Sequence, residues 1–406
     1  MRSTIKNETD WFSLLLLTIA AIIFVTAELV PVGILPEIST SFQQPIGKVG
    51  LMVTSYAWTV ALSAVFITTW LAPLERRMLL LIIIFLFAIA NLTVACSPSL
   101  TILFIARIIG AFSHGVFWSI VGPLCMRLSG QSTKARATAI VFGGIAVATV
   151  MAVPAGTLLA QWVGWRFVFV AIAFISLMIG VAIALRFPKL HSESRGCLGQ
   201  LPELIRHPLL RQLLPATALA LTGHFCAFTY ISLLLGKNMG VAHTHLAFYL
   251  FLFGAAGVIG NILAGMLADR QLRHACQWVM TTMAIVIMLS ACLSAGTDIL
   301  AALLVVVWGA GICILTITLQ SLILTLPVHA TDAASALYVS MFNMGIGGGA
   351  LLGGIIVDHL PIQAVAWVGS AILLAAALIV GWPIKTKINR DLRTVNLNQI
   401  SERNNI

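Results

Sequence analysis

Long hydrophobic runs separated by short polar segments make up almost the whole chain. Each run is close to the roughly 20 residues that an α-helix needs to cross a bilayer. The pattern predicts an all-α integral membrane protein with twelve transmembrane helices, at residues 12–35, 47–71, 78–96, 100–127, 135–161, 166–187, 212–236, 245–268, 276–295, 299–326, 333–357 and 362–383.

The composition agrees with this pattern and excludes most other classes of protein. Hydrophobic residues make up 60% of the 406 residues and charged residues only 9%, whereas soluble proteins carry about 25% charged residues. The net charge of +10 does not indicate nucleic-acid binding, because Lys and Arg concentrate in alternate connections between the helices. With the N-terminus inside, all but four of the 23 lie in cytoplasmic segments; the exceptions are Lys48, Arg107, Arg166 and Lys237. The positive-inside rule therefore predicts that both termini face the cytoplasm.

The longest polar interruption divides the predicted helices into two sets of six. We expect an N-terminal half at residues 1–187, a cytoplasmic linker at 188–211, a C-terminal half at 212–383 and a cytoplasmic tail at 384–406. An acid–base pair recurs at equivalent places, because Glu75-Arg76 precedes the third helix and Asp269-Arg270 precedes the ninth. This repeat predicts two related six-helix halves around a central cavity.

Short motifs occur at defined places in these helices and loops. They are Gly265-Met-Leu-Ala-Asp269-Arg270 with its partial copy Glu75-Arg76-Arg77, Arg107-Ile-Ile-Gly110 in the fourth helix, Pro154-Ala-Gly156 in the fifth and Gly164-Trp165-Arg166 at the start of the sixth. Together they resemble the motifs of the major facilitator superfamily, although Val153 replaces a glycine of its antiporter motif. The resemblance implies a transport function, with Glu75, Arg76, Gly265, Asp269 and Arg270 taking part in conformational change.

A second set of stretches extends the resemblance over nearly the whole chain. They are Thr26-Ala-Glu28-Leu-Val-Pro31-Val-Gly33, Tyr56-Ala-Trp58, Ala111-Phe-Ser-His114, Phe117-Trp118-Ser119-Ile120 and Phe342-Asn343-Met-Gly345-Ile-Gly347. They are similar to bacterial sugar efflux transporters of the drug:proton antiporter branch, and a nearby group of purine ribonucleoside exporters has similar stretches. Leu233 stands where these transporters often have a proline. The resemblance implies a multi-pass protein of the bacterial inner membrane that exchanges sugars for protons, with Glu28 as the coupling acid.

The chemistry of three polar residues inside predicted helices points to proton coupling. An intramembrane carboxylate such as Glu28 costs about 2.5–3.5 kcal/mol on insertion scales and by default marks a functional site. Arg107, in the same half of the membrane, is close enough for an ion pair. His114 shares a helix face with Arg107 and can donate, accept or titrate. The alternative for each residue is a purely structural role, with Arg107 as a fixed partner of Glu28.

A larger set of polar and aromatic residues is predicted to bind the solute. Imidazoles and amides supply donors and acceptors to hydroxyl groups, and aromatic rings stack on the apolar face of a sugar. The candidates are Phe24, Tyr56, Trp58, His114, Trp118, His224, Phe228, Tyr230, Gln320 and Asn343. Packing and hydrogen bonds between helices are the alternative for all of them.

No motif in the sequence predicts an enzyme or a cofactor. The glycine run from Gly345 to Gly354 is interpreted as a device for close helix packing, and no phosphate-binding loop or metal-ligand spacing is present. We expect a monomer in the lipid bilayer whose partners are a small-molecule substrate and protons, with no metal and no nucleic acid. The alternatives are a multidrug or purine nucleoside exporter of the same superfamily and a non-transporting membrane sensor.

Overall fold

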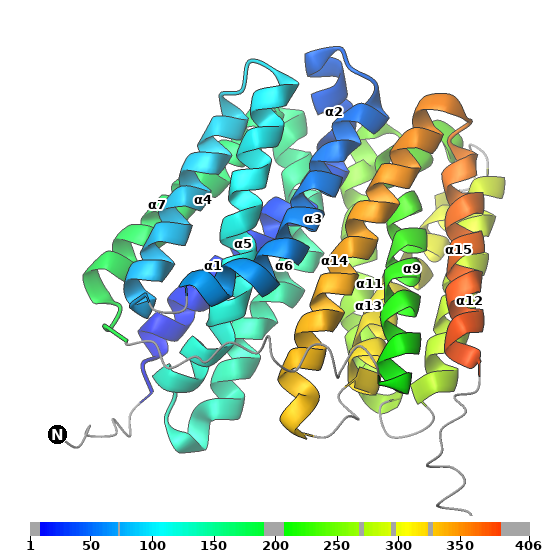
Figure 1. The fold of residues 1–406 in the computed structure, drawn as a ribbon. Helices are drawn as coiled ribbons and strands as arrows, with labels where there is room; N and C mark the ends of the chain where they lie inside the picture. The colour runs from blue at the N-terminus through cyan, green and yellow to red at the C-terminus, as the bar shows by residue number, and fades with distance from the viewer. Residues whose placement is uncertain are drawn as a thin grey trace, which may run out of the picture.

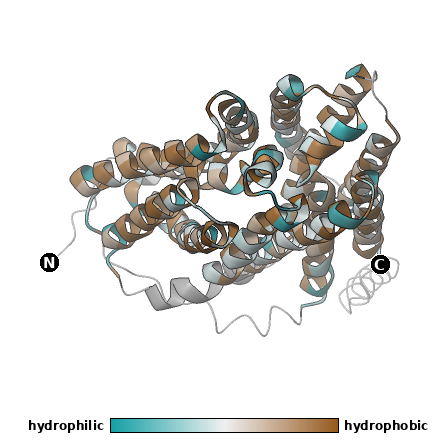
Figure 2. Ribbon diagram, turned by 90° about the horizontal axis from the view of Figure 1, so that it is seen from above, coloured by the Kyte–Doolittle hydropathy of each residue, from teal (hydrophilic) through white to brown (hydrophobic). Residues whose placement is uncertain are grey.

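A computed structural model describes residues 9–71, 74–190, 207–267, 272–293, 298–323 and 328–382. Within these residues every regular element is a helix. Figure 1 shows the long helices packed side by side as a bundle. Large hydrophobic side chains such as Leu185, Trp278 and Ile299 are more than two-thirds exposed, and Figure 2 shows hydrophobic residues, in brown, along all the long helices. A bundle with such a surface suits lipid and not water.

The first half of the chain forms seven helices that correspond to the first six predicted spans. They are α1 (Trp11–Leu29), α2 (Pro31–Phe42), α3 (Ile46–Leu71), α4 (Arg76–Ala95), α5 (Leu100–Leu128), α6 (Lys134–Val163) and α7 (Trp165–Arg186), with the short η1 (Gln131–Thr133) before α6. The first span was predicted to end at residue 35, but α2 continues it to Phe42. The last turns of α2 carry polar residues, so the apolar run in the sequence ends before the helix does.

The second half supplies the other six spans. They are α9 (Pro208–Phe228) with α10 (Ile231–Leu233) and the π-helix η3 (Leu234–Asn238), α11 (Leu246–Leu267) preceded by η4 (His243–His245), α12 (Leu272–Cys292), α13 (Asp298–Ile323), α14 (Val328–His359) and α15 (Gln363–Gly381). The span of α9 bends by 42° before residue 231, so the bend forms without the proline that Leu233 replaces. Ten helices among the described residues are long and apolar enough to cross a membrane, and this bent span is an eleventh. The 26-residue α3 stands at the second predicted span, 47–71, which is the remaining one of the twelve.

The two halves pack their helices in the same pattern. In the N-terminal half α1 packs on α6, α3 on α5, and α4 on both α5 and α7. The equivalent pairs in the C-terminal half are α9 on α14, α11 on α13, and α12 on both α13 and α15. The architecture is therefore two six-helix halves with matching topology.

Two pairs of long helices join the halves, α3 with α14 and α6 with α11, and the short α10 also contacts α2. Glycines allow these backbones to approach closely. A Cβ added to Gly254 on α11 would lie 2.6 Å from the Cα of Val150 on α6, and one added to Gly347 on α14 would clash with the indole of Trp58 on α3. The glycine run on α14 thus serves packing, as its small residues indicate.

The contacts between the halves include a cluster at one end of the bundle. We call the end where α1 begins and α15 ends the terminal side, and the opposite end the far side (Figure 1). On the far side the Gly47 amide donates to Asp358 at 2.8 Å, Ser232 donates to the Val32 carbonyl at 3.2 Å, and His243 lies 3.2 Å from Glu37. Towards the terminal side α3 and α14 diverge in Figure 1. The halves are therefore held together on the far side.

Candidate functional site

Glu28 lies in the last turn of α1, next to a break that its own sequence causes. An α-helical amide donates to the carbonyl four residues earlier, but Pro31 has no N–H to donate to the Ala27 carbonyl. Helix α1 ends at Leu29, and α2 begins with Pro31 at its first position. The motif Ala27-Glu28-Leu29-Val30-Pro31 thus places an acid beside a carbonyl that has lost its helical partner.

Arg107 on α5 takes the place of the missing amide. Its Nη1 donates to the Ala27 carbonyl at 2.7 Å, and its guanidinium carbon lies 4.0 Å from the centre of the Tyr56 ring. Only 2% of the Arg107 side chain is exposed. A cation over an aromatic face is stabilised by the ring quadrupole. The proline therefore explains why a buried arginine lies so close to Glu28.

The ion pair that the sequence allows between Glu28 and Arg107 is not formed. The ionisable side chain that lies next to the Glu28 carboxylate is His114, whose Nε2 is 3.7 Å from Oε2, and the two form an ion pair only when the ring is protonated. Within the described residues, Nε and Nη2 of Arg107 have no hydrogen-bonding partner. Arg107 acts on the Glu28 carboxylate through its nearby positive charge and not through a direct contact. The carboxylate is therefore not locked by a bidentate arginine.

His114 on α5 has hydrogen bonds at both ring nitrogens. The indole N–H of Trp118 donates to Nε2 at 2.6 Å, and the Tyr56 hydroxyl lies 2.8 Å from Nδ1. An indole can only donate, so Nε2 carries no proton in the neutral ring and Nδ1 must carry it. Nδ1–H then donates to Tyr56. Glu28, His114, Tyr56, Trp118 and Arg107 thus form one connected polar cluster, which we call the N-half cluster.

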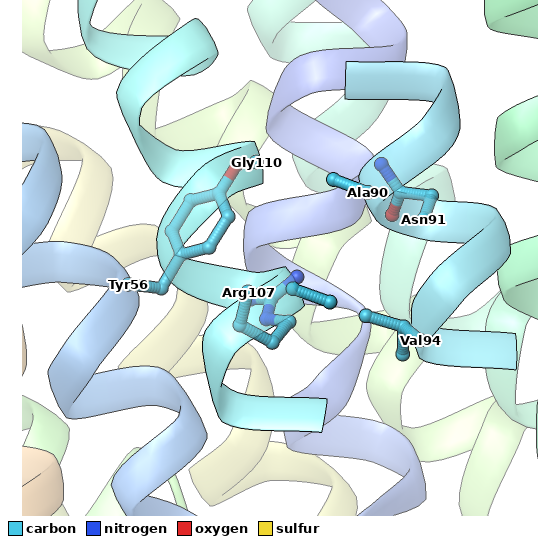
Figure 3. Close-up of a pocket in the computed structure, with 7 residues that line it drawn as sticks. Tyr56, Ala90, Asn91, Val94, Arg107 and Gly110 are labelled. Atoms are coloured by element: carbon cyan, nitrogen blue, oxygen red, sulfur yellow. The ribbon is translucent and has the colours of Figure 1, made fainter. Parts of the chain in front are cut away.

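A small pocket lies against this cluster. It is lined by Tyr56 of α3, by Ala90, Asn91 and Val94 of α4, and by Ala106, Arg107 and Gly110 of α5 (Figure 3). Asn91 is buried and donates to the Phe87 carbonyl at 2.8 Å. Asn91 was not among the predicted site residues, although an amide inside an apolar helix is a signal for a polar site.

His224 on α9 lies among aromatic side chains. Its ring stacks on Phe228 at 5.1 Å between centroids and an 18° interplanar angle, with Phe253 of α11 at 6.4 Å. The indole of Trp308 on α13 donates to Nδ1 at 3.0 Å. We call these residues, together with Phe225, the C-half cluster. Trp308 was missed in the sequence, although a buried indole N–H requires a partner and so marks a polar site.

The other predicted solute-binding residues lie apart from the two histidines or have packing roles. Trp58 donates to the Met344 carbonyl at 3.2 Å and Tyr230 donates to the Ala350 carbonyl at 2.9 Å, so both tie their helices to α14. Phe24 is buried between Phe87 and Phe117. Gln320 is exposed on α13. The buried Asn343 donates to the Val339 carbonyl at 3.0 Å, and its Oδ1 has no partner among the described residues.

Comparison with known proteins identifies the family. The sequence profile of the Major Facilitator Superfamily matches residues 17–331. This chain belongs to the major facilitator superfamily. Members of this superfamily carry small molecules across membranes, so the chain is a multi-pass secondary transporter.

Solved structures of the superfamily share the fold. A bacterial homologue of the human lysosomal transporter Spinster, in its inward-facing and occupied conformation, is 16% identical with a TM-score of 0.74, and the match covers 91% of this chain and 96% of that one. The inward-facing and unoccupied structure matches with 16% identity and a TM-score of 0.71, over 91% and 94% of the two chains. At this identity the match shows the fold alone.

Glu75, from the stretch predicted to be a partial copy of the inner-loop motif, caps helix α4 on the terminal side. Its carboxylate accepts from the amides of Arg77 at 3.0 Å, Met78 at 3.1 Å and Leu190 at 2.8 Å. Burial alone would raise the pKa of this carboxyl, but the three backbone donors outweigh it and hold the pKa below its ordinary value. Arg76 returns a bond from its amide to the Leu190 carbonyl at 2.8 Å. Gly265 lies in α11, and Asp269 and Arg270 lie outside the described residues.

Proposed function

We propose that this chain is a proton-coupled exporter of small neutral sugars or sugar-like solutes, working by alternating access of its two halves. Protons enter from outside and solute leaves in exchange. The single observation that carries the proposal is Glu28, a membrane-buried acid that lies 3.7 Å from a histidine and is not locked in an arginine ion pair. The resemblance to bacterial sugar efflux transporters supports a bacterial inner membrane, and the distribution of Lys and Arg supports both termini in the cytoplasm.

The proton step is assigned to the N-half cluster. A carboxylate beside a ring nitrogen and a nearby cation can exist in a charged and a protonated form, each with a different set of hydrogen-bonding partners. Protonation of Glu28 removes its attraction to the Arg107 charge. That change alters how tightly α1 and α5 are held together at the Pro31 break, and so couples proton binding to the motion of the half.

The solute step is assigned mainly to the C-terminal half. The hydrogen bond that the described residues give the His224 side chain is at Nδ1, from Trp308, which leaves Nε2 available to a solute, and Asn343 has an unpartnered amide oxygen. Helices α9 and α14, which carry these two groups, pack directly against each other. A donor and an acceptor beside aromatic rings suit a polyhydroxylated solute.

One observation favours a second candidate, a purine nucleoside. The rings of His224, Phe228 and Phe253 lie nearly parallel, with Phe228 and Phe253 4.7 Å apart. Flat heteroaromatic bases bind well to such stacks. The same proton-coupled exchange would then carry a nucleoside in place of a sugar.

Transport into inverted membrane vesicles tests the proposal. Labelled glucose, labelled inosine and a labelled cationic dye are supplied outside the vesicles, whose interior corresponds to the cell exterior. We expect glucose to accumulate only when the interior is acidic, and a protonophore to abolish the accumulation. Accumulation of inosine alone would select the second candidate. Glucose accumulation driven by the opposite pH gradient, or by no gradient, would contradict proton antiport.

A further inference from the structure

Each of the two buried histidines receives an indole N–H, but at a different ring nitrogen. Trp118 donates to Nε2 of His114, and Trp308 donates to Nδ1 of His224. A neutral imidazole has one N–H and one acceptor nitrogen, and an indole is a donor only. The two tryptophans therefore hold the two histidines in opposite tautomers.

We propose that Trp308 is a positioning residue that fixes His224 as the Nε2–H tautomer and so presents a hydrogen-bond donor to the transported solute. With Nδ1 occupied by the indole, the single proton of the neutral ring resides on Nε2. That N–H has no partner among the described residues. Nε2 is not among the fully buried side-chain nitrogens that lack a partner in the described residues, so it reaches open space in which a solute oxygen can accept from its N–H. The functional part of this inference rests on the proposed transport function.

Packing fixes the direction of this donor as well as its chemistry. Phe228 stacks on one side of the His224 ring, and Phe225 meets it edge-on with centroids 4.8 Å apart. Trp308 is itself only 1% exposed and packs against Phe253 at 5.9 Å. Neither ring can turn without displacing the others. Trp308 thus sets both the tautomer and the orientation of His224.

The opposite tautomer of His114 explains why the donor comes from the C-terminal half. Both nitrogens of His114 are occupied, Nε2 by Trp118 and Nδ1 by Tyr56. This ring offers a solute nothing until one of those bonds breaks. The group that His224 recognises is an oxygen with a free lone pair, such as a sugar hydroxyl, a ring oxygen or a carbonyl.

Nitrogen NMR of protein labelled with ¹⁵N-histidine tests the tautomer without any solute. The His224 signals are assigned as those missing from a His224→Gln variant. We expect Nδ1 at the position of an unprotonated nitrogen and Nε2 at that of a protonated one. Trp308→Phe should populate both tautomers, whereas Trp278→Phe, a tryptophan 72% exposed on α12, should leave the spectrum unchanged. An Nδ1–H signal for His224 in the unmodified protein would overturn the proposal, even if Trp308→Phe does not fold.

A double-mutant cycle separates positioning from simple packing. The dissociation constants of labelled glucose and labelled inosine are measured in detergent for Trp308→Phe, His224→Gln and the double variant. Gln carries its amide N–H where Nε2 stood and needs no indole to orient a proton. With His224 present, we expect Trp308→Phe to weaken binding of one probe by roughly fivefold, about the value of one hydrogen bond. In the His224→Gln background, we expect the same substitution to change the dissociation constant little. Equal loss in both backgrounds would show that Trp308 is only structural. If the NMR result holds and neither probe binds, the tautomer assignment stands and the proposed substrates are wrong.

Discussion

The two halves of this transporter share a packing pattern but surround their buried histidines differently. In the N-half cluster, His114 touches a carboxylate, a phenol and an indole, with a buried arginine nearby. In the C-half cluster, the ring contacts and the side-chain hydrogen bond of His224 within the described residues are all with aromatic side chains. The same residue type can therefore serve charge movement in one half and solute recognition in the other.

The difference originates in one proline. Pro31 deprives the Ala27 carbonyl of its helical donor, and Arg107 supplies the replacement. In the C-terminal half the corresponding span also bends, but by local backbone hydrogen bonds such as that from the Tyr230 amide to the Ala227 carbonyl at 3.2 Å. That bend leaves no carbonyl paired with an arginine.

Arg107→Ala should have the largest effect, because it removes what distinguishes the N-half cluster. The Ala27 carbonyl loses its side-chain donor and Tyr56 loses its cation. The hydrogen bond to the charged group is worth about 1.5–3 kcal/mol. We expect a lower melting temperature in detergent and no gradient-driven transport. Arg107→Lys keeps the charge and should lose less of both. If the Arg107→Ala protein is as stable and as well coupled as the unmodified one, Arg107 has no role in proton coupling.

His224→Ala should have the next largest effect and should affect binding alone. It removes the free N–H and the stacking partner of Phe228, so we expect roughly tenfold weaker solute binding, about 1.4 kcal/mol. The ratio of transport with and without a pH gradient should not change, because the N-half cluster is intact. The measurement is half-saturation in vesicles at each gradient. Loss of coupling in this variant would erase the distinction between the halves.

Tyr56→Phe should have a moderate effect of the opposite kind. It removes the oxygen that accepts from Nδ1–H of His114 while keeping the ring beneath Arg107. One such hydrogen bond is worth about 1 kcal/mol. We expect gradient-driven transport to fall roughly fivefold and solute affinity to stay the same. A change confined to affinity would instead assign Tyr56 to the solute site.

Glu75→Ala should have the smallest effect. We expect it to leave coupling intact, because this acid of the N-terminal half caps a helix and lies outside the N-half cluster. Its loss removes the cap of α4, worth about 1 kcal/mol, and leaves coupling unchanged. Because the folded-state pKa of Glu75 lies below its ordinary value of 4.5, its contribution is present above that pH and is lost as the pH falls through the folded value. The difference in melting temperature between the two proteins should therefore shrink in acid. A difference that grows in acid would contradict the capping role.

The fold was largely predictable from the sequence, because crossing a bilayer imposes long apolar runs whose number and spacing are visible. The end of α2 was not, since its last turns leave the apolar run and are polar. The solute site was less predictable than the proton site. An acid such as Glu28 is conspicuous in an apolar run, whereas Trp58 and Trp308 look alike in sequence. Only three-dimensional packing shows that Trp58 bonds a backbone carbonyl of α14 and Trp308 bonds His224.

The ion pair of Glu28 with Arg107 illustrates the same limit. The depths of Glu28 and Arg107 in their spans indicated that the two residues lie near each other. Whether the guanidinium binds Glu28, Ala27 or Tyr56 depends on which of these groups lacks another partner. Pro31 provided that information, through the carbonyl that it leaves free. A proline four residues after a buried residue is thus a sequence signal for where a buried donor will bind.

The most direct test of the central claim compares two modes of transport in proteoliposomes containing Glu28→Gln. Exchange of labelled glucose for unlabelled glucose requires no net proton movement, whereas accumulation against a gradient does. If Glu28 carries the proton, exchange should persist and pH-driven accumulation should disappear. Accumulation at an unchanged rate in Glu28→Gln would show that Glu28 does not carry the proton.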